Sequence, residues 1–213
     1  MKVELLSTYG DDNVIVEVAR VSYNKLANQY TQEQNNKLIK YLAEHKHTSP
    51  FRHCQIQFRI ECPIYVERQL FKHQVGVSVN SISGRYVDFS DTYTRIDKWR
   101  KQSTNSKQGS EGNVDEYTND YCNMVQNQVI DTCQKAYQQL TDLGVSKEQA
   151  RTILPLNLNT TFIWTGSLLA FIHMCHLRLK PDAQEETRLL VAEMLQQLKD
   201  SNKFEQSLKV FNL

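Results

Sequence analysis

A chain of 213 residues fits one domain that can bury a core without disulfides or metals. It carries 25 lysines and arginines against 24 aspartates and glutamates, and this near balance argues against a protein that grips a long polyanion. The hydrophobic fraction is 40%, and no apolar run approaches the roughly 20 residues of a membrane-spanning helix. The bulk numbers therefore favour a soluble protein that binds neither membranes nor polynucleotides.

The cysteines indicate a reducing compartment. There are five of them, an odd number, and no two show CxxC spacing. They are Cys54, Cys62, Cys122, Cys133 and Cys175. The first residues lack a basic region followed by an apolar core, so we expect no secretory signal. Both observations predict a cytoplasmic protein with free, buried thiols.

The beginning of the chain predicts a strand and two helices. Residues 1–8 alternate between apolar and polar side chains, as an opening strand does, and residues 11–23 have the character of a short helix. Thr31 and Gln34 have the spacing of a capping box, and the helix that they start is expected to end near His45.

Residues 54–62 give the clearest strand pattern in the chain. Every second residue is apolar and is expected to face the core: Cys54, Ile56, Phe58, Ile60 and Cys62. The polar residues between them face the other way, where they could meet water or a ligand. Pro63 closes the strand, and residues 65–72 predict a helix that leads into the next segment.

Segment 72–86 is the most informative stretch of the sequence. It combines a lysine, a histidine, an amide, several serines and a glycine, with Arg85 near its end. This composition is typical of a tight loop whose backbone N–H groups surround an anion while the guanidinium closes over it. The segment lacks GxxxxGK[ST] and GxGxxG, so it is neither a P-loop nor a dinucleotide fingerprint. Judged alone, it could equally be a polar surface turn.

The middle of the chain predicts an insertion and a long helix. Residues 102–113 contain no apolar side chain and are expected to form an exposed, mobile loop. Residues 114–143 predict a long helix whose apolar stripe would be either core or subunit interface. A further helix is expected to begin at Ser146 and to carry Arg151.

The last third predicts two more helices. Residues 161–172 are apolar and lead through Gly166 into a helix that presents His173, His176 and Arg178. Asp182 and Glu185 are expected to cap the last long helix. The buried stripe of that helix would consist of Leu190, Val191, Met194, Leu195 and Leu198. Because no linker, repeat or change of composition divides residues 1–213, we expect a single α+β domain with a β-sheet flanked by helices.

The histidines do not predict a metal site. His45, His47 and His53 have no acid or cysteine at ligand spacing, and His173 with His176 lacks a third ligand. We therefore expect no metal.

Segment 72–86 resembles the defining motif of the flavin-dependent thymidylate synthases, R-H-R-x2-S-x-N-x2-S-x-R. The motif positions are occupied here by Lys72, His73, Gln74, Ser78, Asn80, Ser83 and Arg85. Further blocks similar to that family follow in its order within residues 45–190. They are residues 50–53, 68–69, 151–158, 162–166, 177–179 and 182–184. The chain departs from the pattern where Lys72 and Gln74 replace arginines, where one extra residue precedes Ser78, and where Ser81 replaces a common acidic residue.

The resemblance implies a reaction and its partners. Members of this family reductively methylate dUMP to dTMP, with methylenetetrahydrofolate as carbon donor, NADPH as reductant and FAD as hydride carrier. They are homotetramers in which each active site is built from more than one subunit. The expected partners are therefore dUMP, folate and further copies of this chain.

The resemblance also implies the site residues. Substrate-binding positions fall on Gln69, Lys72, Ser81, Ser83, Gly84, Arg85, Arg151 and Arg178. Cofactor-binding positions fall on His53, Gln55, His73, Gln74, Ser81, Ser167 and His173. The catalytic position falls on Arg178, where the family's arginine supports ionisation at N3 of uracil. An arginine has a pKa above about 12 and cannot accept a proton, so its role would be to stabilise developing negative charge.

Two alternatives remain open at this point. A nucleotide-binding regulator could retain the pocket without turnover, and the altered residues Lys72 and Gln74 favour that interpretation. A nucleic-acid-binding module is disfavoured by the net charge. A cysteine nucleophile, the other known route to thymidylate, has little support, because only Cys175 lies beside a possible activating group, His176.

Overall fold

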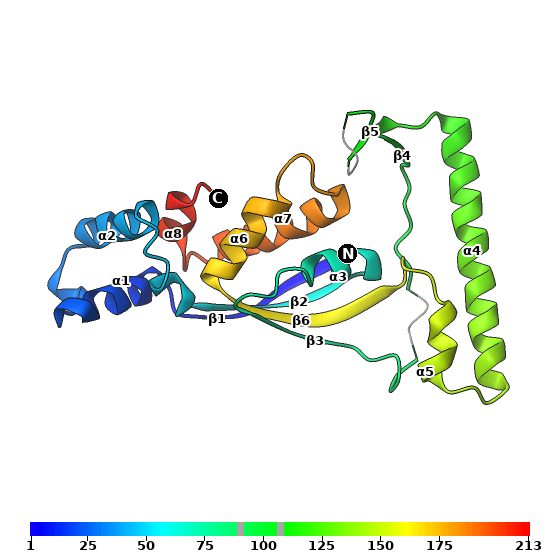
Figure 1. Cartoon of the computed structure of the whole chain (residues 1–213), viewed down its shortest axis with the longest axis horizontal. Coiled ribbons are helices and arrows are strands. Elements are labelled where there is room, and N and C mark those ends of the chain that lie inside the picture. Colours follow the sequence, from blue (N-terminus) through cyan, green and yellow to red (C-terminus); the bar gives the residue numbers. More distant parts are fainter. Residues whose placement is uncertain (89–91, 106–108) are drawn as a thin grey trace.

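The computed structural model describes residues 1–88, 92–105 and 109–213. Its centre is an antiparallel sheet of four strands in the order β1-β2-β6-β3 (Figure 1). The strands are β1 (Lys2–Tyr9), β2 (Gln55–Pro63), β6 (Asn159–Ser167) and β3 (Val77–Ser81). The chain is thus an α+β domain, as the sequence predicts.

Strand β2 confirms the alternating pattern of the sequence. Cys54 and the four apolar residues that follow at every second position are completely buried. Strand β6 pairs along the whole of β2, with Phe58 opposite Trp164. The sequence shows residues 161–172 only as an apolar run, whereas the structure divides them into the end of β6 and the start of a helix. The side chains of β6 are buried or half-buried on both faces, so its alternation is weak.

Three helices cover one face of the sheet. They are α3 (Ile64–Leu70), α6 (Leu168–Arg178) and α7 (Glu185–Asp200), and each packs against sheet strands (Figure 1). The predicted stripe of α7 is buried throughout. Its N-cap, however, is Gln184 without a side-chain bond, so the prediction that Asp182 and Glu185 cap it is wrong. Within the described residues, no helix lies over the opposite face of the sheet, which carries mainly polar side chains such as Gln55, Gln57 and Arg59.

A second group of helices lies at one end of the sheet. Helix α1 (Asp12–Arg20) is capped by Asp11, and α2 (Gln32–Glu44) begins with the predicted capping box of Thr31 and Gln34. Both pack against the short helix α8 (Glu205–Val210). Single 3₁₀ turns occur at Val21–Tyr23, Ala27–Gln29, Pro50–Arg52 and Arg151–Ile153.

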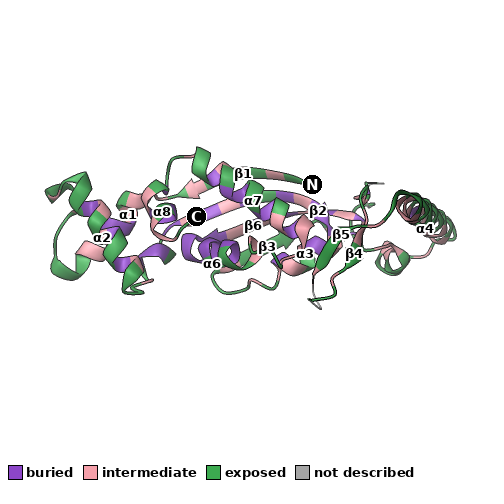
Figure 2. Cartoon of the chain, turned by 90° about the horizontal axis from the view of Figure 1, so that it is seen from above, coloured by how far each residue is buried: buried purple, intermediate pink, exposed green. Residues whose placement is uncertain are grey.

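Helix α4 (Glu116–Asp142) stands apart from the sheet at the other end of the molecule (Figures 1 and 2). All its residues are described, and only Ile130 among them is buried. The exposed members of its apolar stripe are Tyr117, Tyr121, Met124, Val125 and Val129. This part of the stripe is therefore not core of this chain, and its role as a subunit interface stays a prediction. The next helix, α5 (Lys147–Ala150), continues into the 3₁₀ turn that carries Arg151.

Residues 102–113 are more regular than their composition predicts. Strands β4 (Arg100–Gln102) and β5 (Ser110–Asn113) pair antiparallel as a hairpin. Their side chains are largely exposed, as expected, but the expectation of a loop is wrong for these strands. Backbone pairing needs no apolar side chain, and polar cross-strand bonds such as Ser103 Oγ to Glu111 Oε2 (3.0 Å) support it. Residues 106–108, within the stretch predicted to be mobile, lie outside the described residues.

The largest side chains in the core beneath the helices are aromatic. Phe58, Phe162, Trp164 and Phe171 are buried, and Phe71 meets Phe162 edge to face with ring centroids 5.2 Å apart. No helix among residues 1–88, 92–105 and 109–213 has the length and apolar character needed to cross a bilayer.

Gly166 is required by the close approach of the Trp164 ring. A Cβ at this position would lie 2.6 Å from Cη2 of Trp164. We predict that Gly166→Ala destabilises the fold by about 1–3 kcal/mol, because the buried indole is packed against Phe58 and Phe171 and cannot move aside. Chemical denaturation would measure the change. Gly112→Ala, where a Cβ meets no atom within 4 Å but φ is +53°, reports the cost of backbone strain alone.

Candidate active site

Part of the motif segment is an edge strand. Residues Val77–Ser81 pair with β6, with Val77 opposite Gly166 and Ser81 opposite Phe162. The expectation of a loop across residues 72–86 is therefore wrong for this stretch. The polar composition suits a strand at the edge of a sheet, where one side meets solvent.

The register of β3 distributes the motif over two faces. Ser78 and Asn80 lie opposite Thr165 and Ile163, on the face of the sheet away from the helices. Ser81 faces the helices, and its hydroxyl lies 3.4 Å from Oε1 of Glu67 in α3. A ligand of Ser81 would thus lie on the side of α3, separate from a ligand of Asn80.

Arg178, Gln69 and His73 meet at the C-terminal ends of α6 and α3. Nε of Arg178 donates to Nε2 of His73 at 3.0 Å, and Nη2 donates to the backbone carbonyl of Gln69 at 2.9 Å. The structure therefore joins the predicted catalytic residue to one predicted substrate residue and one predicted cofactor residue. Helix carbonyls at a C-terminus carry partial negative charge, which favours the guanidinium there.

Electrostatics in this cluster follow from burial. Burial lowers the pKa of His73, and the adjacent Arg178 lowers it further. A neutral imidazole is also what the hydrogen bond requires, since Nε2 must accept. Burial likewise lowers the pKa of Arg178, yet an arginine keeps its charge at neutral pH. The cluster thus presents a partly desolvated cation whose hydrogen-bond partners, the His73 ring and the Gln69 carbonyl, carry no full negative charge.

The side chain of Gln69 is held by helix α7. Its Oε1 accepts from the hydroxyl of Thr187 at 3.0 Å, and its Nε2 donates to Oε1 of Gln184. Thr187 is completely buried. Sequence reasoning missed both partners as site residues. Gln184 could have been found from its family-like block, but a buried threonine in a helix stripe gives no such signal.

A second group of predicted residues follows β3. The backbone N–H of Arg85 donates to Oγ of Ser83 at 3.3 Å, and Gly84 is buried. Nε of Arg85 lies 3.1 Å from Oε2 of Glu148 in α5, with 53% and 61% of the two side chains exposed. Arg151 begins the turn directly after α5. This pair of arginines therefore belongs to one region beside α5, open to solvent.

A third group surrounds the start of α6. Gln55 lies opposite Ser167 across β2 and β6, and the hydroxyl of Ser167 caps α6 by accepting from Ala170 at 3.2 Å. The N–H of Ser167 donates to the carbonyl of Gly76 at 3.0 Å. Gly76 has φ +73°, and a Cβ there would come within 3.1 Å of the Ser167 hydroxyl. The backbone of the motif segment at Gly76 is therefore in close contact with the N-terminal end of α6.

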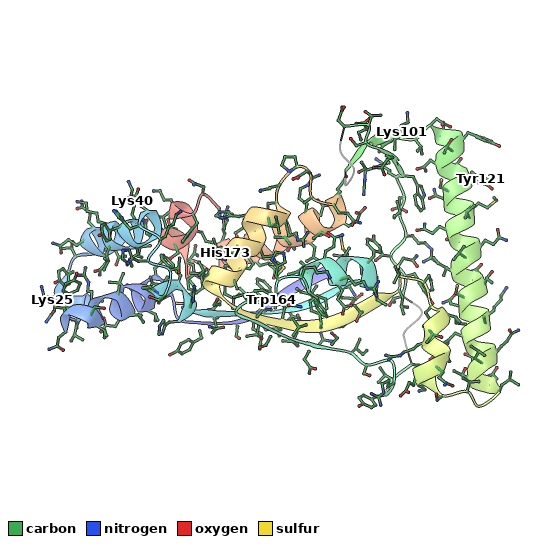
Figure 3. All side chains as sticks on the ribbon, in the orientation of Figure 1. Lys25, Lys40, Lys101, Tyr121, Trp164 and His173 are labelled. Carbon is green, nitrogen blue, oxygen red and sulfur yellow. The ribbon has the colours of Figure 1, made fainter. Side chains whose placement is uncertain are left out.

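The remaining predicted residues are exposed. They are His53, Lys72, Gln74 and His173, of which His173 lies along α6 (Figure 3). The 11 residues of α6 separate the Ser167 group from Arg178 by about 15 Å. Among the described residues, no contact joins Arg85 or Arg151 to Arg178. One chain therefore holds three separate groups of predicted site residues.

Three of the cysteines lack the properties of a nucleophile. Cys54, Cys62 and Cys175 are completely buried, and burial raises the pKa of each thiol to about 12. Almost no thiolate then exists at neutral pH, and the thiolate is the reactive form. Cys122 and Cys133 are half-buried on α4. Within the described part of the chain, no three histidines, cysteines or acids form a group that could hold a metal ion.

We predict that each of the five Cys→Ala variants keeps the activity that the family resemblance implies. Buried cysteines act as small apolar residues, so Cys54→Ala and Cys62→Ala should instead lose about 1 kcal/mol of stability. Assays well below each melting temperature separate lost chemistry from unfolding. A folded, flavin-bound single variant without turnover would show that a thiol takes part.

The fold is that of a nucleotide methylase of known structure. It superposes with a TM-score of 0.88 on the UMP/dUMP methylase PolB from Streptomyces cacaoi, solved with 5-Br dUMP. The two are 25% identical, and the match covers 99% of this chain and 94% of that one. Residues 4–201 also match the family described as thymidylate synthase complementing protein.

Sequence relatives identify the family more narrowly. A flavin-dependent thymidylate synthase of Thermus thermophilus is 41% identical over 187 residues, which are 87% of this chain and 67% of that protein. The enzyme of the same name from Kosmotoga olearia is 37% identical over 184 residues, 86% of this chain and 79% of that protein. The chain belongs to the flavin-dependent thymidylate synthase family.

Proposed function

We propose that this protein reductively methylates dUMP to dTMP, with methylenetetrahydrofolate as carbon donor, NADPH as reductant and FAD as hydride carrier. The family and the 41% identity to the Thermus enzyme support the activity. The observation that carries it is the Arg178 cluster, because a fixed and partly desolvated cation is what stabilises charge developing on a uracil ring.

Each group of residues has a role in this proposal. Arg178 stabilises the negative charge that develops on the pyrimidine, and Gln69 and His73 fix its direction. Arg85, with Ser83, Gly84 and Arg151, binds the phosphate, which suits an open cationic region. Lys72 and Ser81 complete the substrate contacts. When dUMP binds, its phosphate would replace the carboxylate of Glu148 as the partner of Arg85.

The predicted cofactor residues fit a flavin. His53, Gln55, Gln74, Ser167 and His173, together with His73, would hold it. Imidazoles and amides offer both donors and acceptors, as the edge of a flavin ring requires. Bound FAD supplies hydride transfer, a capacity that no side chain has. The protonated thiols of Cys54, Cys62 and Cys175 agree with a route that needs no cysteine nucleophile.

We further propose a homotetramer with shared active sites. Support comes from the separation of the three groups within one chain and from the exposed apolar stripe of α4, of which Tyr121 is labelled in Figure 3. Single exposed apolar residues are ordinary, but a stripe along a helix is typical of an interface. The compartment implied by the free thiols is the cytoplasm.

The test is a turnover assay with dUMP, methylenetetrahydrofolate and NADPH, run with and without FAD. We expect dTMP only when FAD is present, and flavin absorbance retained after excess FAD is removed. Binding of dUMP without turnover would favour a nucleotide-binding regulator instead. UMP should be assayed in parallel, since the similar Streptomyces structure is named as a methylase of both nucleotides.

A further inference from the structure

A continuous chain of polar contacts runs from the motif histidine to the β4–β5 hairpin. Arg178 joins His73 to the carbonyl of Gln69, and the Gln69 side chain reaches Gln184 and Thr187. Nε2 of Gln184 then donates to Oε2 of Glu186 at 2.9 Å. The other oxygen of that carboxylate, Oε1, lies 2.6 Å from Nη2 of Arg100. The hairpin and the predicted catalytic arginine are therefore physically connected.

The amide of Gln69 is the central link. Its oxygen accepts from Thr187 while its nitrogen donates to Gln184, so rotation of the amide would break both bonds. The carbonyl of the same residue accepts from Arg178. Thr187 therefore fixes the last turn of α3 from the protein interior. The Gln69 carbonyl of that turn then orients the guanidinium of Arg178.

The outer links are charged and partly shielded from water. The side chain of Glu186 is 13% exposed and that of Arg100 23% exposed. Nη1 of Arg100 also lies 3.3 Å from Oε2 of Glu185, so it ties both acids of the first turn of α7 to the hairpin. Burial alone would raise the pKa of Glu186, but hydrogen bonds from Arg100 and Gln184 hold it below its ordinary value. Glu186 thus stays ionised and keeps Gln184 in place.

We propose that Thr187 is a positioning residue for Arg178, acting through Gln69, and that the ion pair between Arg100 of the hairpin and Glu186 of α7 supports the same arrangement. The inference rests on the function proposed above for its effect on turnover. The geometric part of the inference, that Thr187 holds Arg178 against His73, does not depend on the proposed function. The loss of the Thr187 hydroxyl should therefore let Arg178 drift from the direction that the reaction needs.

Thr187→Val removes the hydroxyl and keeps the shape, whereas Thr187→Ser keeps the hydroxyl. We expect Thr187→Val to lower kcat by about tenfold with a smaller change in KM, because the partly buried Gln69 oxygen loses its donor. Thr187→Ser should recover most of the loss. Thr160→Val is the matched control, since Thr160 is also a buried threonine but lies in β6, away from these contacts.

Titration of His73 by NMR gives a readout that does not need turnover, with His73→Gln to assign the signal. In the wild type, burial and then Arg178 keep the pKa of His73 low. Release of Arg178 should move that pKa toward its ordinary value in Thr187→Val and leave it low in Thr187→Ser and Thr160→Val.

Two results would overturn the inference. One is an unchanged kcat and an unchanged His73 titration in Thr187→Val, which would leave Thr187 a packing residue. The other is a Thr187→Ser variant as impaired as Thr187→Val, which would show that the hydroxyl is not responsible. If the wild type does not turn over dUMP, the proposed function fails, and the His73 titration alone decides whether Thr187 positions Arg178.

Discussion

Replacing Arg178 with alanine is expected to lower kcat/KM for dUMP by roughly 10²-fold or more. That is the order of effect seen when one preorganised donor to a developing oxyanion is removed. Arg178 is held by a carbonyl and a neutral imidazole, neither of which neutralises it, so its charge is free to act on the substrate. Steady-state kinetics on the folded variant would measure the loss.

Two control variants separate the effect of the positive charge of Arg178 from the effect of its orientation. Arg178→Lys keeps the charge but cannot reach both His73 and Gln69, so it should recover only part of the rate. Arg95→Ala removes an exposed arginine that bonds Asn127 in α4, and should leave kcat/KM near the wild-type value. Near-normal turnover in Arg178→Ala would make Arg178 a structural cation.

The second large effect is expected at Arg85. We predict that Arg85→Ala raises the KM for dUMP by roughly 10- to 100-fold with a smaller change in kcat. A charge-assisted hydrogen bond to phosphate has about that strength, and the phosphate is remote from the reacting carbon. Titration of dUMP into the flavin-loaded protein would measure the affinity directly.

Glu148 provides the matched control, because it is the partner of Arg85 without substrate. Glu148→Ala should leave the KM unchanged or lower it, since the guanidinium is then free for the phosphate. If both variants weaken dUMP binding equally, the ion pair shapes the region and Arg85 does not bind the phosphate. The pair is exposed on both sides, so neither variant should lose much stability.

Local patterns in the sequence predicted the helices and strands that are specified by residues close together along the chain. The capping box of α2, the alternation of β2 and the apolar stripe of α7 each depend on neighbouring residues along the chain, and each is present. The motif and the similar blocks identified the family and the predicted site residues. Of those residues, Arg178, Gln69 and His73 are brought together.

Only the tertiary structure decided which polar segments pair and which residues support the site. Strand β3 and the β4–β5 hairpin owe their form to backbone bonds with distant or unpredictable partners, which leave no apolar pattern in the sequence. The long helix α4 has a core-like stripe, but its N-terminal part, from Tyr117 to Val129, is exposed in this chain. Thr187 contacts Gln69 across 118 residues of sequence, so its place beside the predicted active site appears only when α3 and α7 are packed together.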